Sequence, residues 1–167
     1  KTNSKVIAMD LSKQENVLSL CDQIKDENID ILINDAGFGA FGNFYETSLE
    51  NEINMIETNI TALHILTKFC LKNMRNKNYG YILNVSSIAS FEPGPLMATY
   101  YATKAYVKSL SRAISKELQK EKSKVHVSVL CPGPVNTNFN NVAGVKFSIK
   151  PISSEYVAKY AIDKLLK

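Results

Sequence analysis

Short apolar runs alternate with longer amphipathic segments along this chain. Runs rich in Val, Ile and Leu predict four buried strands, at residues 5–9, 29–33, 80–85 and 125–130. In the segments between and after these runs, apolar residues recur every three or four positions. This spacing predicts four helices: one beginning near residue 12, two over about 49–74 and 98–118, and one from Ser153 or Ser154 to about Leu166.

Each predicted helix has a start signal or a clear apolar face. Residues 12–15 (Ser-Lys-Gln-Glu) and 47–50 (Thr-Ser-Leu-Glu) fit capping boxes. The faces expected to pack on the sheet are Val17, Leu20, Cys21 and Ile24; Leu49, Ile53, Ile56, Ile60 and Leu63; and Val107, Leu110, Ile114 and Leu118. Asn59 lies within the second of these faces. A buried Asn needs hydrogen-bond partners, so either a helix bend or bound water, or an ordinary packing amide, is expected there.

The order β-α-β-α-β-α-β-α predicts a parallel sheet, because helices of this length connect parallel strands by right-handed crossovers. The strands are continuously apolar, which is typical of a sheet covered on both faces. We therefore expect an α/β fold: one domain over residues 1–167, with a doubly wound parallel sheet in three αβα layers. A barrel of eight strands needs a longer chain.

Composition narrows the possible functions. The chain is 45% apolar and 22% charged, which disfavours disorder, and its net charge of +4 is scattered, which disfavours nucleic-acid binding. No apolar run approaches the length of a membrane span. The cysteines form no CxxC pair and the histidines have no metal-ligand spacing. We expect no metal, and a cytoplasmic protein whose Cys21, Cys70 and Cys131 are reduced core thiols.

The candidate chemistry lies where strands end, because open α/β sheets bind ligands at the carboxyl ends of their strands. The four predicted strand ends carry small or polar residues, Asp10-Leu11, Asn34-Asp35-Ala36-Gly37, Ser86-Ser87 and Pro132-Gly133. Gly37 and Gly133 permit close approach of the backbone to a ligand. This arrangement predicts an extended ligand that crosses several strand ends.

Tyr100 and Lys104 form the strongest candidate for catalysis. They are four residues apart at the start of a predicted helix, so both side chains lie on one face. A nearby ammonium lowers the pKa of a phenol and makes it a usable general acid or base. An ordinary surface Tyr/Lys pair is the alternative. Ser87 ends the preceding strand, thirteen residues before Tyr100.

Together these motifs resemble the short-chain dehydrogenase/reductase family, in its order and spacing from about Val6 to the last helix. The resemblance implies a Rossmann-like fold and a catalytic tetrad of Asn59, Ser87, Tyr100 and Lys104. It also implies NAD or NADP as cofactor. The implied cofactor residues are Asp10 and Leu11 near the adenine; Asn34, Ala36 and Gly37; and, near the nicotinamide, Pro132, Gly133, Val135 and Thr137, with Tyr100 and Lys104.

The family mechanism implies a role for each tetrad residue in interconverting a carbonyl and an alcohol by hydride transfer. Tyr100 donates a proton to the carbonyl oxygen, and Lys104 lowers the tyrosine pKa and binds the nicotinamide ribose. Ser87 holds the substrate oxygen, and Asn59 positions a water that links Lys104 to solvent. We choose Ser87 over Ser86 because neighbours in a strand point to opposite faces.

The chain departs from the family pattern in two ways. Asp35 replaces the second Asn of an Asn-Asn-Ala-Gly motif, and a carboxylate cannot donate the hydrogen bonds of an amide. No strand with a glycine-rich turn, which binds the pyrophosphate, precedes Lys1. The resemblance therefore implies a domain truncated at its N-terminus, and short of the family's C-terminal end. Alone it is expected to bind dinucleotide poorly and to have doubtful activity.

Other functions stay open at this stage. A non-catalytic Rossmann-like remnant, acting as a binding or assembly module, is the main alternative, and a methyltransferase is disfavoured by Tyr100 and Lys104. The expected partner is a small carbonyl or alcohol substrate. An apolar portion of that substrate, or simple packing, would account for a set of residues near the expected cleft, Phe38, Phe41, Phe44, Leu96 and Met97.

The helices near 49–74 and 98–118 show apolar or small residues beyond their sheet-facing stripes, Met55, Ala62 and Leu66 on one and Ala102, Tyr106 and Ala113 on the other. A second apolar face is usually buried against something. Members of the family that this chain resembles commonly assemble through these two helices. We therefore expect a homodimer or homotetramer, with a monomer as the alternative.

Overall fold

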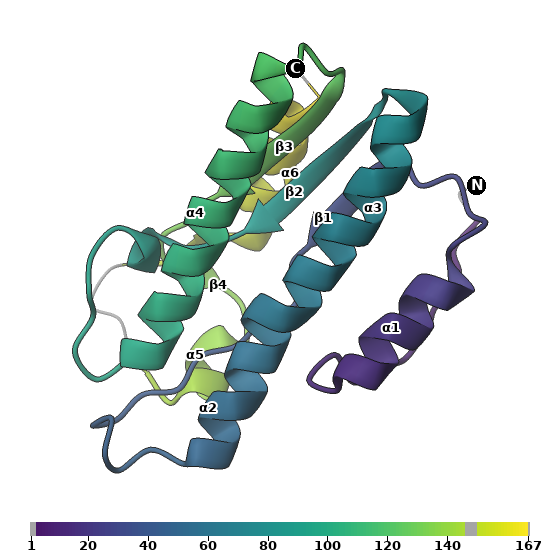
Figure 1. Cartoon of the computed structure of the whole chain (residues 1–167). Helices are drawn as coiled ribbons and strands as arrows, with labels where there is room; N and C mark the ends of the chain where they lie inside the picture. Colours follow the sequence, from purple (N-terminus) through teal and green to yellow (C-terminus); the bar gives the residue numbers. More distant parts are fainter. Residues whose placement is uncertain (1–2, 146–149, 167) are drawn as a thin grey trace.

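The computed structural model describes residues 3–145 and 150–166. Its centre is a parallel sheet of β1 (Ile31–Asn34), β2 (Gly80–Val85) and β3 (Val125–Leu130), in the order β1-β2-β3. Asn34 lies opposite Asn84, and Val85 lies opposite Leu130. Helices α3 (Leu63–Lys77) and α4 (Ala98–Lys120) cover one face and α6 (Ser154–Leu165) packs on the other, so the layers are αβα (Figure 1).

Smaller elements surround this core. Helix α1 (Gln14–Gln23) packs on α3, and α2 (Leu49–Ile56) continues through the π-helix η1 (Glu57–Ala62) into α3. A short 3-10 helix, η2 (Ile88–Ser90), follows β2. The segment after β3 forms β4 (Val135–Asn136), α5 (Phe139–Ala143) and β5 (Ile152–Ser153), and β4 pairs with β5 in parallel. Helix α5 was not among the helices predicted from the apolar spacing.

Two of the four predicted strands are confirmed at their expected bounds, and the strand expected at 29–33 begins two residues later and ends one residue later, at 31–34. The strand predicted at residues 5–9 is wrong, because that segment is irregular and Val6 is 87% exposed. A strand requires a neighbour to pair its backbone groups. Within the described residues β1 is the edge strand and pairs only with β2, so residues 5–9 have no partner.

The predicted capping boxes are not formed as expected. The Ser12 hydroxyl donates to the Asp10 carboxylate at 2.8 Å, and α1 begins after Lys13 without a side-chain cap. At the second site Ser48 rather than Thr47 is the N-cap, and its hydroxyl accepts from the Asn51 N–H. The N-cap Ser153 of α6 is confirmed.

The π-helix η1 explains why the predicted apolar face of the long helix is only partly correct. Leu63 is buried, but Leu49 is 72% and Ile53 is 48% exposed. A π-turn contains one more residue than an α-turn, so the residues before it are rotated relative to a continuous 3.6-residue repeat. Glu52 and Met55 are buried in their place.

A buried hydrogen-bond network joins the sheet to the two helices on its face. The Asn34 amide donates to Asn84 Oδ1 at 2.8 Å and to Thr67 Oγ1 at 3.0 Å. The Asn84 amide donates to Ser111 Oγ at 2.9 Å. Asn84 is fully buried, and unpaired amide groups there would lose their bonds to water without replacement. The network therefore favours one pairing register of β1 with β2 and one position of α3 and α4 on the sheet.

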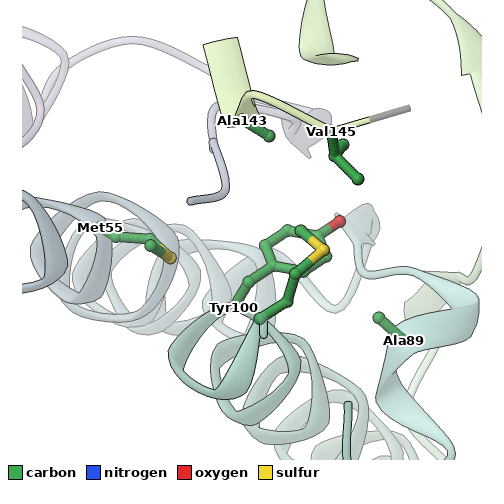
Figure 2. Close-up of a cluster of buried hydrophobic side chains, with 6 residues drawn as sticks. Met55, Ala89, Tyr100, Ala143 and Val145 are labelled. Atoms are coloured by element: carbon green, nitrogen blue, oxygen red, sulfur yellow. The ribbon is translucent and has the colours of Figure 1, made fainter. Parts of the chain in front are cut away.

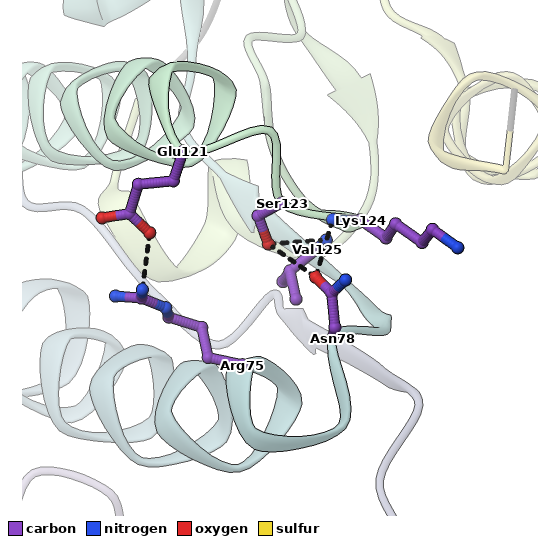
Figure 3. Close-up of polar contacts among 6 residues, drawn as sticks. All are labelled: Arg75, Asn78, Glu121, Ser123, Lys124 and Val125. Atoms are coloured by element: carbon purple, nitrogen blue, oxygen red, sulfur yellow. Dashed lines mark hydrogen bonds and ion pairs between the residues drawn. The ribbon is translucent and has the colours of Figure 1, made fainter.

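The opposite, amino-terminal edge of the sheet is held by contacts at the end of α3 (Figure 3). Asn78 ends α3 in the left-handed region, with φ of 48°, and its Oδ1 accepts from Ser123 Oγ and the Lys124 N–H. An exposed ion pair between Arg75 and Glu121 joins α3 to the end of α4. Within the described residues no helix is long and apolar enough to cross a bilayer.

Replacing Asn84 by Ala should lower the free energy of unfolding of the protein by about 3 kcal/mol, because Asn34 and Ser111 would lose a partner in the core. Urea denaturation measures this change. Asn73→Ala, at an exposed position of α3, is the control and should stay within about 0.5 kcal/mol of the wild type. Equal effects of the two substitutions would contradict a stabilising network.

Candidate active site

The loops that leave the strands come together at the carboxyl edge of the sheet. The Ser86 N–H donates to the Leu130 carbonyl at 2.7 Å, and the Ile88 N–H donates to the Pro132 carbonyl at 3.0 Å. These bonds tie the exits of β2 and β3 to each other. The first turns of α4 reach the same edge, so Tyr100 and Lys104 lie beside the predicted strand ends.

Lys104 is buried at the end of β2. Its side chain is anchored by a hydrogen bond from Nζ to the Val85 carbonyl at 3.0 Å, and the residue is only 6% exposed. Burial lowers the pKa of the Lys104 ammonium to about 8, and the negative groups of Asp35 and Cys131 oppose this decrease. The Ser86 hydroxyl donates to the Lys104 carbonyl at 2.7 Å, which fixes this turn of α4 to the strand.

Tyr100 lies one helical turn before Lys104, in a buried cluster (Figure 2). The residue is 8% exposed, and the Phe139 ring of α5 lies 5.3 Å from its ring. Figure 2 shows four other side chains of this cluster: Met55 of α2, Ala89 of η2, Ala143 of α5, and Val145, which follows α5. The catalytic-site candidate is therefore covered by α5.

The expectation that Lys104 lowers the pKa of Tyr100 is wrong for this structure. Burial raises the pKa of the Tyr100 hydroxyl, while a hydrogen bond with Ser87 acts in the opposite direction. Lys104 Nζ is 5.8 Å from the centre of the tyrosine ring and is bonded to Val85 instead. At this separation the loss of solvation decides the direction of the shift.

Ser86 and Ser87 point to different surroundings, as the alternation of a strand predicts. Ser86 is 3% exposed and is engaged with the backbone of α4. Ser87 Oγ accepts from the Ala89 N–H at 3.1 Å, and Ser87 is the serine that acts on the Tyr100 hydroxyl by lowering its pKa. The structure thus brings Ser87, and not Ser86, to the tyrosine hydroxyl.

Asn59 sits inside the π-helix and is 1% exposed. Its Oδ1 accepts from the Phe38 N–H at 3.0 Å, and its Nδ2 donates to the Phe38 carbonyl at 2.8 Å and to Thr103 Oγ1 at 3.1 Å. The side-chain amide therefore pairs with both backbone groups of one residue. The sequence predicted either a helix bend or bound water at Asn59, or an ordinary packing amide. The structure has a distorted helix at this point and an amide whose hydrogen bonds are all made within the protein.

Gly37 lies between Asn59 and Lys104. A Cβ atom at Gly37 would be 2.9 Å from Asn59 Oδ1 and 3.5 Å from Lys104 Nζ, so no larger residue fits without displacement. The neighbouring Asn34, a predicted cofactor residue, turns its side chain into the buried network with Asn84. The Asn34 side chain thus has a structural role, and its expected contact with the cofactor stays a prediction. Ala36 is exposed at the loop.

The other predicted cofactor residues fall into two groups. Pro132 and Gly133 lie beside the end of β2, and a Cβ at Gly133 would meet only Ile88 Cδ1, at 4.0 Å. Beyond them the Thr137 hydroxyl accepts from the Phe139 N–H, and Val135 forms β4. The second group, Asp10 and Leu11, lies in the segment before α1. The Ser12 hydrogen bonds lower the pKa of the exposed Asp10 carboxyl, and Leu11 packs against the α1–α3 core.

Apolar residues near Tyr100 differ from those expected. Phe38 and Met97 pack in its cluster, whereas Phe41, Phe44 and Leu96 are 46%, 66% and 41% exposed. Phe139, Ala143 and Val145 also contribute to the cluster, and the sequence analysis did not predict them. The four-residue spacing of Phe139 and Ala143 was the available helical signal.

Comparison with known proteins decides the family. Residues 1–145 match the model of the family described as short chain dehydrogenase. The chain belongs to the short-chain dehydrogenase family. Its geometry fits this membership, since Ser87, Tyr100 and Lys104, the residues that the resemblance predicts for catalysis, lie at one strand edge. Within the described residues, no group of three or more His, Cys, Asp or Glu side chains is arranged to hold a metal ion.

Relatives and solved structures are similar at modest identity. The chain is 31% identical over 160 residues to an uncharacterized oxidoreductase of Staphylococcus saprophyticus, covering 93% of this chain and 68% of that one. It is 30% identical over 136 residues to dehydrogenase/reductase SDR family member 11 of Homo sapiens, covering 78% and 52%. A short-chain dehydrogenase from Sphingobium yanoikuyae, in complex with NADPH, superposes with a TM-score of 0.84 at 26% identity, covering 93% and 62%.

This chain of the short-chain dehydrogenase family spans about half the length of several curated relatives that it matches. The comparison therefore establishes the family and the fold of these residues. The activity, substrates and partners of the whole protein do not follow from this comparison, and they are proposed below.

Replacing Gly37 by Ala should destabilise the protein by about 2 kcal/mol, because the new methyl group must displace the Asn59 amide or the loop. Thermal or urea denaturation measures the effect. Gly133→Ala is the matched control, since its Cβ meets only one atom at van der Waals distance, and it should change stability by less than about 0.5 kcal/mol. A neutral Gly37→Ala would show that the loop is not clamped as the structure describes.

Proposed function

We propose that the protein is an NAD(P)-dependent oxidoreductase that interconverts a carbonyl and an alcohol, with Tyr100 as general acid and base. One observation carries the proposal: Tyr100 and Lys104 are both buried one helical turn apart, with Lys104 Nζ 5.8 Å from the centre of the tyrosine ring, and Ser87 acts on the pKa of the tyrosine hydroxyl. A structural scaffold has no need to bury an ammonium beside a phenol, since both groups cost solvation energy there. This argues against the non-catalytic alternative.

The described residues fit the nicotinamide end of a dinucleotide. Lys104 Nζ has three donors, and within the described residues its hydrogen bond is to Val85 alone, so two donors remain for ribose hydroxyls. The backbone at Gly133 lies open beside the same edge. The described part of the chain contains no glycine-rich turn at a helix start for the pyrophosphate. When bound, the dinucleotide supplies or accepts the hydride.

The proposed reaction assigns one task to each tetrad side chain. Ser87 holds the carbonyl oxygen of the substrate by a hydrogen bond. Tyr100 donates its hydroxyl proton to that oxygen during reduction and takes it back during oxidation. Lys104 orients the cofactor ribose. Asn59 positions a water that connects Lys104 with solvent, and its bonds to Phe38 keep the loop after β1 in place.

The raised pKa of Tyr100 sets a condition on this mechanism. A phenol with a raised pKa is a weaker acid than an ordinary tyrosine, so efficient proton donation near neutral pH requires that this pKa be lowered in the loaded site. Positive charge brought near the hydroxyl would lower that pKa again. Phe38, Met97 and Phe139 line the same cluster, which supports a substrate with an apolar portion next to its carbonyl group.

Replacing Tyr100 by Phe should lower kcat for carbonyl reduction at least ~100-fold, because the ring is retained but the proton donor is lost. The assay uses the native full-length protein and a panel of ketones and aldehydes, with NADH and NADPH compared. Tyr101→Phe is the control, since that ring packs against the same cluster, and it should keep most of the activity. Near-normal turnover of Tyr100→Phe would exclude the proposed tetrad.

We further propose that the protein is a homodimer or homotetramer that uses the helices near 49–74 and 98–118. Met55, Ala62 and Leu66 do not support this interface, because they are buried within the chain. The outer faces instead expose Leu49, Ile53, Ala102, Tyr106 and Ala113.

Three free cysteines support the assignment to the reducing cytoplasm.

Ala102→Glu combined with Ala113→Glu should convert the assembly to monomers, because four charges would face one another across a two-fold interface. Light scattering at micromolar concentration measures the mass. Leu18→Glu, which adds a charge at an exposed apolar site on α1, is the control and should leave the mass unchanged. A wild-type protein that is already monomeric would refute the interface.

A further inference from the structure

Asp35 occupies the loop that follows β1, next to the anchor point of Lys104. In the parallel register of β1 and β2 the last described pair is Asn34 and Asn84. The next residues are Asp35, where β1 has ended, and Val85, which still pairs with Leu130 of β3, and the two strands lie about 4.8 Å apart where they pair. The Val85 carbonyl is the group that binds Lys104 Nζ.

The loop that carries Asp35 is held against the lysine. Asn59 binds both backbone groups of Phe38, at 3.0 and 2.8 Å. Gly37 passes so close to the ammonium that a Cβ there would lie 3.5 Å from Nζ. Asp35 is two residues before Gly37, so the clamp that fixes the loop also limits how far the Asp35 backbone lies from Lys104.

Lys104 needs a nearby negative charge more than an ordinary lysine does. It is 6% exposed, and within the described residues it has no carboxylate ion pair. The groups that act on its charge are the Asp35 carboxylate and, to a lesser extent, the Cys131 thiol, and the Tyr100 ring lies 5.8 Å away. Burial alone drives the ammonium towards its neutral form.

We propose that Asp35 is a positioning residue that acts through Lys104: its carboxylate extends to higher pH the range over which the lysine stays protonated. This rests on the proposed function, in which Lys104 works as a cation. An amide at position 35 would supply no charge. Asp35 is exposed, so solvent weakens its field, and the effect on Lys104 is moderate.

The direction of the effect of Asp35→Asn follows from the charge. Loss of the carboxylate lowers the pKa of Lys104 further below its usual value, so the lysine loses its proton at a lower pH. The alkaline limb of the kcat/KM profile should move to lower pH by about half a unit, the size expected for one screened charge. Activity at pH 6 should change little, because Lys104 is protonated there in both proteins.

The decisive measurement is the titration of Lys104 itself, followed by NMR of the protein labelled with 13C at lysine Cε, without any cofactor or substrate. Lys104→Arg identifies the signal. In Asp35→Asn the midpoint should fall by about half a unit, and in Asp35→Glu, which keeps the charge, it should stay near the wild-type value. Asp26→Asn, which removes an equal charge after α1, is the control and should have no effect.

The outcomes separate this inference from the proposed function. An unchanged Lys104 midpoint in a folded Asp35→Asn protein overturns the role of Asp35, whatever the activity. A lowered midpoint in Asp35→Asn together with an unchanged one in Asp35→Glu supports it, even if no carbonyl substrate is turned over. If Asp35→Asn does not fold, a shifted midpoint in Asp35→Glu would overturn the inference, because charge rather than shape is held responsible.

Discussion

The side-chain amide of Asn59 is the contact on which the site depends. It binds the backbone of Phe38 on one side and the Thr103 hydroxyl of α4 on the other. The loop after β1 and the helix that carries Tyr100 and Lys104 are thereby fixed to the same long helix. An amide is needed for this, because it donates and accepts at the same time. The π-helix around it turns the amide towards the loop, since an unbroken α-helix would rotate this part differently.

The contacts of Asn59 hold in place a site at the end of β2 that contains two buried ionisable groups. Lys104 and Tyr100 are both buried, and burial disfavours the charged form of each. The lysine is compensated by the Val85 carbonyl and by the negative groups nearby, and the tyrosine by Ser87. Groups kept in such an unfavourable state are typical of functional sites, and here they support the proposed proton transfer.

The rest of the fold serves to hold the strand ends in register. The buried amides of Asn34 and Asn84 connect neighbouring strands and reach the helices above them. At the opposite edge Asn78 ties the end of α3 to the start of β3. Because both edges of the sheet are fixed, the loops at its carboxyl edge begin from defined positions. One of these loops carries α5, which covers Tyr100.

The sequence by itself determined the fold class, the parallel β2 and β3, the helices on the sheet and the family, because these follow from periodicity and from motifs at fixed spacing. It also predicted which residues belong to the candidate tetrad. Tertiary structure decided the rest. The strand expected at residues 5–9 depends on a pairing partner, which periodicity does not report. The direction of the Tyr100 pKa shift depends on burial by α5, and the role of Asn34 depends on which face of β1 meets Asn84. Such properties arise from contacts between residues far apart in the sequence, so only the folded chain determines them.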